Sequence, residues 1–509
     1  MKSCKKIMFP ILIALVATLS SCNFLDIFLN SNNQDEYSYP EEESENISSN
    51  AGYYRAGYSD ITYYDVGKKS LYGAHTLNTL GTQKILVVPV IIEGFESLAT
   101  EKVRQEIEAS FFGDSTETGW ESVSSYFYKS SYGNLNITGD VTNWFNPNLT
   151  PNEIHKLQYN DLDDGGTIEL VSLARDFAIS QGYNMKDYDL NSDGYIDSIC
   201  LIYGAPNYSN YSYSLAVRDT MWAFTYWDYK NVNSPSTNNP VPNTYMWASY
   251  DFMYEGSSVG IKIDAHTYIH EMGHVLGLDD YYDYDGLHSP MGCIDMQDCN
   301  VGDHNAFSKY ALGWSRPYVV TDNCTITIKS SATSTHSILV KNPANPWNNS
   351  AFDEYLLLEL VTPENLWKQD STYKYPSLGA YAYQSPGVRI MHVDARLMDH
   401  NEKIVNKLGN GLYTTAYSNT PSFSYSKGTI TLRQDLLALI PANKNLDFQR
   451  KPIKIANDNN LFKTGQVFTT EAYLDFFYNN KLHNGENIPF KITFVDVNKE
   501  SATIKFERI

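Results

Sequence analysis

The stretch from His270 to His274 has the residue types and spacing of a metal-hydrolase site. The two histidines lie four residues apart, so on a helix they project from one face and could bind one zinc ion together. Zinc held in this way keeps a coordination position for water and lowers the pKa of that water to about 7. Glu271 follows the first histidine directly and could take the proton, which would make a nucleophile at neutral pH.

A third ligand is predicted shortly after this helix. Gly277 can adopt the left-handed conformation that ends a helix, so the chain can turn back toward the metal. Asp280 would then complete the set, although a carboxylate elsewhere in the chain could replace it. A bare pair of histidines at this spacing is often a solvated helix face, but glycine and aspartate at fixed offsets favour a metal site. We therefore expect His270, His274 and Asp280 to bind zinc and Glu271 to be the general base.

The pattern His-Glu-x-x-His-x-x-Gly-x-x-Asp resembles the metzincin motif, with aspartate in place of the usual third histidine. The surrounding sequence is similar to one family of this type, the immune inhibitor A-like metallopeptidases. The segments that carry the resemblance are residues 131–135, 263–267, 280–283, 302–309, 312–314, 352–357 and 387–394. The resemblance implies a secreted or surface zinc endopeptidase with a metzincin-like catalytic domain.

Several other residues are candidates for supporting roles near the zinc. Met291, within Ser-Pro-Met-Gly, resembles the methionine turn beneath metzincin zinc sites, and Met296 is the alternative. His266 lies one turn before His270 on the same helix face, and we expect it to be packed or to support a ligand rather than to bind metal. A tyrosine hydroxyl could stabilise the developing oxyanion. The candidates are Tyr281, Tyr282 and Tyr284.

Residues 189–197 match the first nine positions of an EF-hand loop, with oxygen ligands at alternate places and glycine at the sharp turn. Position twelve is Cys200 instead of the bidentate glutamate, so a regular EF-hand is excluded. A smaller calcium site could still form, and the alternative is an Asx-rich turn without metal. Its ligands would be Asp189, Asn191, Asp193, Asp197 and the carbonyl of Tyr195.

The composition and the amino terminus indicate an exported protein. The formal net charge is -21 and the pI is about 4.9, which argues against a nucleic-acid partner because phosphate binding needs clustered Lys and Arg. Residues 1–22 have the lysines and apolar run of an export signal and end in Leu-Ser-Ser-Cys, which resembles a bacterial lipoprotein cleavage box. Cys22 would then be acylated; an ordinary signal peptide with an incidental cysteine is the alternative. Residues 23–50 are polar and acidic and are predicted to form a disordered tether.

The remaining chain divides into three predicted parts. Residues 51–80 are a lead-in strand or a short propeptide, and residues 81–317 are an α/β (α+β) catalytic domain. Residues 318–509 contain short alternating runs separated by Pro, Asn and Gly, which predicts an all-β sandwich. The strands expected in the catalytic domain are 84–92, 135–141, 198–203 and 244–253, and the helices are 100–112, 120–132, 167–181 and 265–276, the last with Asp264 as its N-cap.

Two side-chain pairs remain open from the sequence. Cys293 and Cys299 lie near the expected active site and could form a disulfide, although the four cysteines after export are too few for a disulfide scaffold. His392 and Asp394 lie on one side of a strand. They are either a catalytic pair or, as we expect, a buried hydrogen-bonded pair.

These observations predict a membrane-anchored, extracytoplasmic zinc endopeptidase, monomeric on its tether, that cleaves extracellular protein or peptide. The main alternative is a surface adhesin or a glycan-binding or protein-binding lipoprotein with a structural metal site. Glu271 counts against that alternative, because a structural zinc site has no use for a general base. A metal hydrolase acting on another substrate is the second alternative.

Overall fold

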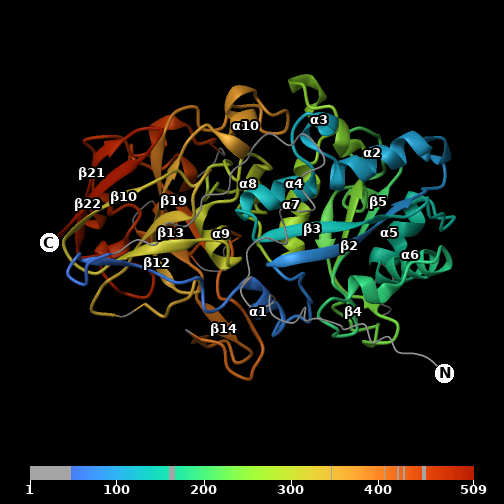
Figure 1. Cartoon of the computed structure of the whole chain (residues 1–509), viewed down its shortest axis with the longest axis horizontal. Coiled ribbons are helices and arrows are strands. Elements are labelled where there is room, and N and C mark those ends of the chain that lie inside the picture. The colour runs from blue at the N-terminus through green and yellow to red at the C-terminus, as the bar shows by residue number, and fades with distance from the viewer. Residues whose placement is uncertain are drawn as a thin grey trace, which may run out of the picture. The chain divides into compact units, whose positions relative to one another are not determined.

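The structure is a computed structural model, and it describes residues 47–159, 167–345, 347–405, 407–420, 424–427, 430–449 and 454–509. The export signal, Cys22 and all but the last four residues of the predicted tether lie outside the described residues. The described residues fall within one compact unit, residues 39–509. Its architecture is mixed α/β with several sheets, which confirms the broad fold class (Figure 1).

The amino-terminal half is built on a five-stranded sheet in the order β3-β2-β5-β8-β6. The first four of these strands are parallel, and β6 is the antiparallel edge. The strand bounds are β2 Gly81–Val90, β3 Leu135–Val141, β5 Ile199–Tyr203, β6 Phe224–Tyr226 and β8 Tyr245–Ser249. The predicted strand at 244–253 is too long, because β8 ends at Ser249 and Tyr250–Val259 forms a 3-10 helix that Ser249 caps.

Helices cover both faces of this sheet because its strands are apolar on both faces. Alternate residues of β2 belong to two different cores: Ile85 and Val87 to one, Leu86 and Val88 to the other. Helices α2, α4 and α7 contribute to the first core and α6 to the second. The helix bounds are α2 Glu101–Phe112, α4 Val123–Ser130, α5 Pro151–Tyr159, α6 Ile168–Ser180 and α7 His266–Val275.

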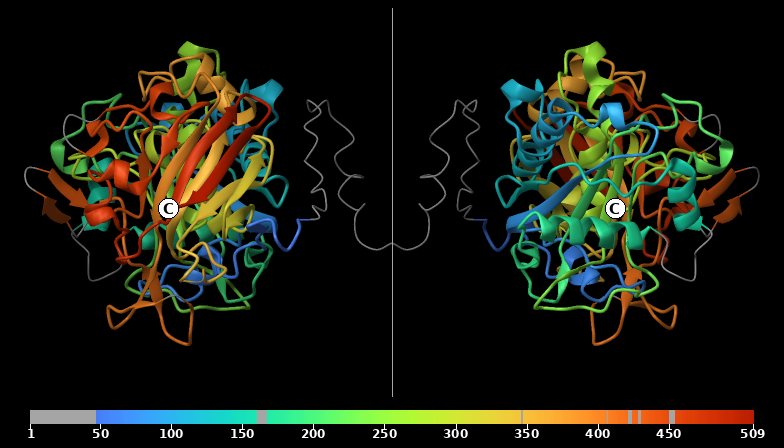
Figure 2. Two further views of the ribbon diagram at one scale, coloured as in Figure 1. Left: turned by 90° about the vertical axis from the view of Figure 1, so that its left-hand side faces the viewer. Right: turned by 90° about the vertical axis from the view of Figure 1, so that its right-hand side faces the viewer.

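The carboxy-terminal half contains two sheets that share a core of their own. A six-stranded sheet has the order β1-β9-β11-β12-β13-β19, and a four-stranded sheet the order β10-β22-β21-β20 (Figure 2). Alternate residues of β12 face opposite ways: Leu356 and Leu358 join the core between the two sheets, and Leu357 joins the core that contains α7. The bounds are β1 Tyr53–Arg55, β9 Arg316–Val320, β10 Cys324–Ile328, β11 His336–Val340, β12 Glu354–Val361, β13 Gly387–Asp394, β19 Leu437–Ile440, β20 Val467–Phe468, β21 Phe490–Val497 and β22 Ala502–Arg508.

Residues 51–80 pack into both halves of the described unit. Strand β1 pairs with β9 at the edge of the six-stranded sheet, and the amide of Leu77 donates to the carbonyl of Val275 at the end of α7. The indole of Trp314 donates to the carbonyl of Thr79. The segment therefore contributes a strand and several fixed contacts to the fold.

The remaining short elements lie mostly in the connections. They are α1 Tyr63–Gly67, α3 Ser115–Thr118, α8 Met296–Cys299, α9 Ala306–Ala311, α10 Lys368–Thr372, β4 Tyr195–Ile196, β7 Val241–Pro242, β14 Leu397–Asp399, β15 Ile404–Val405, β16 Tyr413–Thr415, β17 Ser424–Lys427 and β18 Ile430–Arg433. Within the part of the chain that the structure describes, no helix combines the length and apolarity that a membrane span requires.

Candidate metal centre

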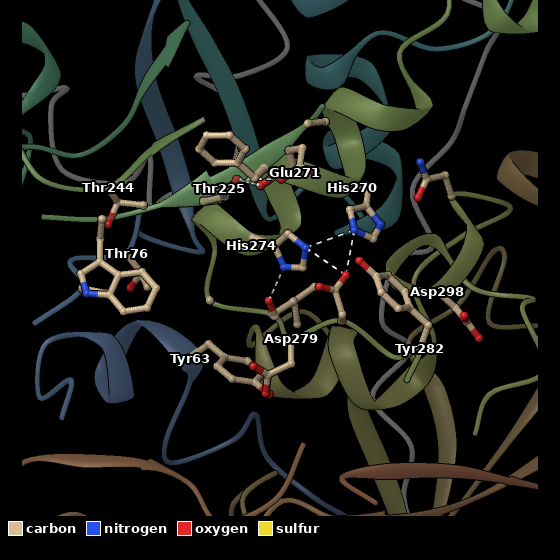
Figure 3. Close-up of a pocket in the computed structure, with 18 of the residues that line it drawn as sticks. Tyr63, Thr76, Thr225, Thr244, His270, Glu271, His274, Asp279, Tyr282 and Asp298 are labelled. Atoms are coloured by element: carbon tan, nitrogen blue, oxygen red, sulfur yellow. Dashed lines mark hydrogen bonds and ion pairs between the residues drawn. The ribbon is translucent and has the colours of Figure 1, made fainter. Parts of the chain in front are cut away.

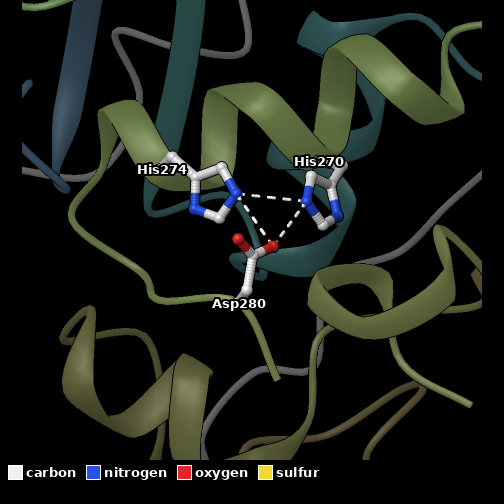
Figure 4. Close-up of side chains that lie close together, drawn as sticks. All are labelled: His270, His274 and Asp280. Carbon is white, nitrogen blue, oxygen red and sulfur yellow. Dashed lines mark hydrogen bonds and ion pairs between the residues drawn. The ribbon is translucent and has the colours of Figure 1, made fainter. Parts of the chain in front are cut away.

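The three predicted zinc ligands converge on one point beside α7 (Figure 4). Oδ1 of Asp280 lies 2.9 Å from Nε2 of His270 and 3.2 Å from Nε2 of His274. The two Nε2 atoms are 3.1 Å apart. Bonds of 2.0–2.2 Å in a tetrahedral zinc site place neighbouring ligand atoms about 3.4 Å apart, so the three atoms have nearly the separation that zinc requires.

The other ring nitrogens of the two histidines fix the positions of their protons. Nδ1 of His270 lies 2.8 Å from the carbonyl oxygen of Met296, and Nδ1 of His274 lies 2.7 Å from that of Leu278. A carbonyl oxygen only accepts, so each Nδ1 carries the hydrogen and each Nε2 of a neutral ring presents a lone pair. Two lone pairs and a carboxylate oxygen then face one another with no hydrogen between them. Such a group needs a cation.

Without a metal, that cation would be a proton. Burial lowers the pKa of His274, but the charge and hydrogen bond of Asp280, the charge of Glu271 and the bond to the Leu278 carbonyl together raise it to about 10. The same histidines hold the pKa of Asp280 far below its usual range against the effect of burial. The donor set of two imidazoles and one carboxylate is one that zinc binds in hydrolases, so the residues present fit that metal. A divalent ion would displace the proton.

The end of α7 brings Asp280 to the histidines. Gly277 has a φ of +98°, in the left-handed region that favours glycine. The turn lets the amide of Leu278 donate to the carbonyl of Gly273, and the Leu278 carbonyl then accepts from His274. A Cβ at position 277 would lie 3.1 Å from Cβ of Tyr63. The helix start differs from the prediction: Ala265 is the cap residue, while Oδ1 of Asp264 accepts from the amide of His266.

Glu271 points into the same space and is held by a residue on the neighbouring strand (Figure 3). Thr225 on β6 donates from Oγ1 to Oε2 of Glu271 at 3.1 Å, and the same hydroxyl lies 2.9 Å from the Glu271 carbonyl. Burial raises the pKa of Glu271, and the nearby His274 and His270 partly offset that rise. A carboxylate whose pKa is raised by burial and whose position is fixed can both accept and return a proton.

A cavity of about 650 Å³ opens over these side chains. His270, Glu271, His274 and Asp280 lie in its wall, and β6 contributes Phe224 and Thr225. Part of the wall comes from the segment before the first sheet strand: Tyr63, Val66, Gly67, Ser70, Ala74 and Thr76. Residues 51–80 therefore shape the cavity as well as the fold.

The two methionines proposed for the turn below the metal have different positions in the structure. Met291 is fully buried in the core that contains α7, but it does not line the cavity. Met296 begins α8, and its carbonyl accepts the Nδ1 hydrogen of His270. Met296 thus contacts a predicted ligand directly, through its backbone rather than through its thioether.

The three candidate tyrosines also differ in where their hydroxyl groups lie. The Tyr284 hydroxyl donates to Oδ2 of Asp280, and Tyr282 lies with its ring 6.4 Å from that of His270, between centroids, and at 19° to it. Both line the cavity. Tyr281 points elsewhere, since its hydroxyl bonds to Oγ of Ser308 at 2.6 Å and its side chain is fully buried. Of the three candidates, Tyr282 and Tyr284 are therefore the ones that can reach a substrate in the cavity.

His266 is packed away from the ligands. Its ring stacks on Trp120 at a centroid distance of 3.8 Å and an angle of 5°, and its Nδ1 lies 2.7 Å from Oδ1 of Asp264. Nε2 lies 3.5 Å from Oδ2 of Asp370. Burial lowers the pKa of His266, but the two carboxylates outweigh it and raise the pKa to about 9. The contacts are those of a packed imidazolium that ties α7 to α10.

The acidic loop at residues 189–197 lies before β5, and its oxygens are largely occupied by the loop itself. Both carboxylate oxygens of Asp189 accept from amides, from Asp193 and Gly194 at 3.0 Å each. Oδ2 of Asp197 accepts from the amide of Leu190 at 2.8 Å, and Oδ1 accepts from the Asn191 amide group at 3.2 Å. Burial, helped by the charges of Asp189 and Asp193, raises the pKa of Asp197 to about 7 against the effect of the Leu190 hydrogen bond. The calcium site stays a prediction.

The cysteine pair is close but not bonded. Cys293 and Cys299 are both free, and their sulfur atoms and a carboxylate oxygen of Asp298 lie within 4.8 Å of one another. A hydrogen bond from Cys299 lowers the pKa of Cys293 to about 7 despite burial. Cys299 and Asp298 line the cavity.

Sequence reasoning missed the groups that hold the ligands and the base. Thr225 is far from Glu271 in sequence and lies outside the predicted strands and helices, so only the pairing of β6 with β8 brings it to the site. The carbonyls of Met296 and Leu278 carry no side-chain signature at all. No protein-family model and no curated protein matches this chain.

Proposed function

We propose that this protein is a zinc-dependent endopeptidase. The observation that carries the proposal is the convergence of Nε2 of His270, Nε2 of His274 and Oδ1 of Asp280 with their lone pairs facing one another. A buried group of acceptors is costly unless a cation occupies the centre. Hydrolysis also needs a proton acceptor and room for a substrate. Glu271 lies beside the centre as the acceptor, and the cavity lies above it.

Zinc bound by these three residues would lower the pKa of a water ligand and polarise the scissile carbonyl. Glu271 takes the proton of the attacking water and passes it to the leaving amine. Thr225 holds Oε2 of Glu271 toward the cavity during both transfers. The Tyr284 hydroxyl lies at the cavity edge, where its hydrogen bonds Oδ2 of Asp280, and it would donate to the oxyanion on exchanging that bond.

The edge of the five-stranded sheet supports a peptide substrate. Strand β6 is the antiparallel edge, it carries Thr225, and its residues line the cavity. An extended peptide could add to such an edge through backbone hydrogen bonds, which would place a scissile bond beside Glu271. An edge strand beside the site is what we expect of the metzincin-like catalytic domain that the resemblance to immune inhibitor A-like peptidases implies.

The location belongs to the same proposal. Export by residues 1–22 and acylation at Cys22 would place the protein on the outer side of a bacterial membrane, with residues 23–50 as its tether and an extracellular protein as its substrate. We propose a monomer. We also propose that residues 51–80 stay in the active enzyme, because β1 and α1 contribute to the sheet and to the cavity wall.

The test is digestion of unfolded casein by the purified protein, with a zinc chelator and with the variant Glu271→Gln as comparisons. The substitution keeps the size of the side chain and removes the proton acceptor, so we expect zinc binding to persist and the rate to fall by roughly two to four orders of magnitude. Glu93→Gln, in an exposed turn, is the matched control and should cleave at the wild-type rate.

Zinc should restore cleavage after chelation in the wild type but not in Glu271→Gln. Cleavage by Glu271→Gln at the wild-type rate would contradict the mechanism. Folded, zinc-loaded wild type that binds protein or glycan without cleaving it would favour the surface adhesin instead.

A further inference from the structure

A second group of metal-ligating side chains, separate from the one on α7, lies where the ends of β12 and β13 meet the turn before β21. Glu354 is the first residue of β12 and stands opposite Asp394, the last residue of β13, in the strand register. His392 projects from the same side of β13 as Asp394. His483 comes from the turn before β21. Three segments distant in sequence thus meet at one place.

The ligand atoms of this group are close to one another. Nε2 of His392 lies 2.9 Å from Oε1 of Glu354, and Nδ1 of His483 lies 3.8 Å from the same oxygen. The ligand atoms of Glu354, His392 and His483 are all within 4.8 Å of one another. Oδ2 of Asp394 lies 2.8 Å from Nδ1 of His483. The ligand atoms of Glu354, His392 and His483 are therefore close enough to share one ion, and Asp394 lies beside His483.

The negative charges of this group are not balanced by positive charges in contact with them. Glu354 and Asp394 are fully buried, and like charges directly opposite on paired strands destabilise a sheet. Arg396 is the fixed positive charge in contact with them, at 2.7 Å from Asp394 and 3.4 Å from Glu354. One buried negative charge therefore remains. Burial and the charge of Asp394 raise the pKa of Glu354 to about 7, against the effects of His483 and Arg396.

The expected hydrogen bond between His392 and Asp394 is wrong, because each side chain has a different partner. His392 bonds to Glu354 across the strands, and Asp394 bonds to Arg396 and His483. The prediction of a buried, hydrogen-bonded histidine does hold, since His392 is 5% exposed. Little water reaches this place, so the group is suited to holding an ion rather than to acting on a substrate.

We propose that Glu354, His392 and His483 bind a second divalent metal ion, with Asp394 as the fourth ligand. Two imidazoles and two carboxylates suit zinc or a similar transition ion better than calcium, which takes oxygen ligands. A closed set of four protein ligands is the arrangement of a structural site. The ion replaces the hydrogens that Nε2 of His392 and Nδ1 of His483 otherwise direct at the carboxylates.

The ion would fasten the carboxy-terminal sheet to the rest of the protein. The amides of His483 and Asn484 donate to the two oxygens of Glu354, so the turn already rests on β12. Residues that follow this turn form β21 and β22, the inner strands of the four-stranded sheet. Metal at Glu354 would link that sheet to β12 and β13 by coordinate bonds as well as by packing.

The test uses the whole protein in which the first site has been removed. The double variant His270→Ala/His274→Ala changes no residue of the second group, so any zinc that it binds can be assigned to that group. After loading with zinc and dialysis, we expect the wild type to hold two equivalents by elemental analysis and the double variant to hold one. Cobalt in place of zinc should give the double variant the visible absorption of tetrahedral Co²⁺.

Adding His483→Ala to the double variant should remove the remaining equivalent and the cobalt absorption. His400→Ala, an exposed histidine on the same half of the chain, is the matched control and should keep both. In the single variant His483→Ala, cleavage of casein should persist in the folded fraction. In the triple variant, which lacks both sites, the thermal midpoint should no longer rise with zinc. A double variant that binds no zinc and shows no cobalt absorption would overturn the proposal.

Discussion

The candidate zinc site and the acidic loop were both singled out by residue type and spacing, but they differ in where their hydrogen-bond donors lie. At His270, His274 and Asp280, the donors point outward to the carbonyls of Met296 and Leu278, and the acceptors are left facing one another. In the loop from Asp189 to Asp197, backbone amides of the loop itself point inward at the carboxylates. The first arrangement requires a cation, whereas the second can exist without one.

The backbone around each motif explains this difference. The helix α7 uses its own amides for helical hydrogen bonds, so its histidine side chains find no donor nearby and must be completed from outside. In the loop, backbone amides four, five and seven residues away donate to the carboxylates of Asp189 and Asp197, and such bonds are typical of aspartate in turns. Residue spacing is therefore a stronger metal signal on a helix than in a turn.

The largest expected effect comes from comparing one alanine substitution in each of the two regions. His274→Ala should lose one equivalent of zinc and lower the rate of casein cleavage by roughly a thousandfold or more, because metal and base act together. Asp193→Ala, the matched change in the loop, should keep that zinc and the rate. Elemental analysis and a cleavage assay check both. Equal loss of activity in the two variants would mean that the loop also supports the site.

A smaller effect is expected from the residue that holds the base. Thr225→Val removes the hydroxyl that donates to Glu271, and one such hydrogen bond contributes about 1 kcal/mol, or about fivefold in kcat/KM. Thr225→Ser keeps a hydroxyl and should retain most of the rate. If valine and serine behave alike, the hydroxyl has no part in positioning Glu271.

The smallest effect should come from calcium at the loop. At ten times a dissociation constant of about 10⁻³ M, calcium would stabilise the folded state by about 1.4 kcal/mol, which corresponds to roughly 1–3 °C in Tm. Asp197→Asn should abolish that shift, since Asp197 is the most buried and least compensated carboxylate of the loop. A shift that survives in Asp197→Asn would place the calcium elsewhere and leave the loop as a metal-free turn.

Much of the candidate site could be predicted because local rules fix it. Four-residue spacing on one helix brings His270 beside His274, and a glycine able to adopt positive φ brings Asp280 back to them. The parallel strands at residues 81–90 and 199–203 could be recognised as apolar runs buried on both faces.

The rest depends on partners distant in sequence. Thr225 reaches Glu271 only because β6 pairs with β8, and Glu354 reaches His392 and His483 only through the register of β12 with β13 and the turn before β21. Strand β1 has three residues and no period of its own, so its place at the edge beside β9 could not be read from residues 51–80. Pairing of this kind is set by tertiary packing rather than by local propensity.

The most direct test of the central claim is an anomalous difference map at the zinc edge from crystals grown with zinc. We predict a peak bounded by Nε2 of His270, Nε2 of His274 and Oδ1 of Asp280, within about 2.0–2.2 Å of each atom. Ordered side chains at these positions with no peak between them, in crystals that contain zinc, would contradict the account.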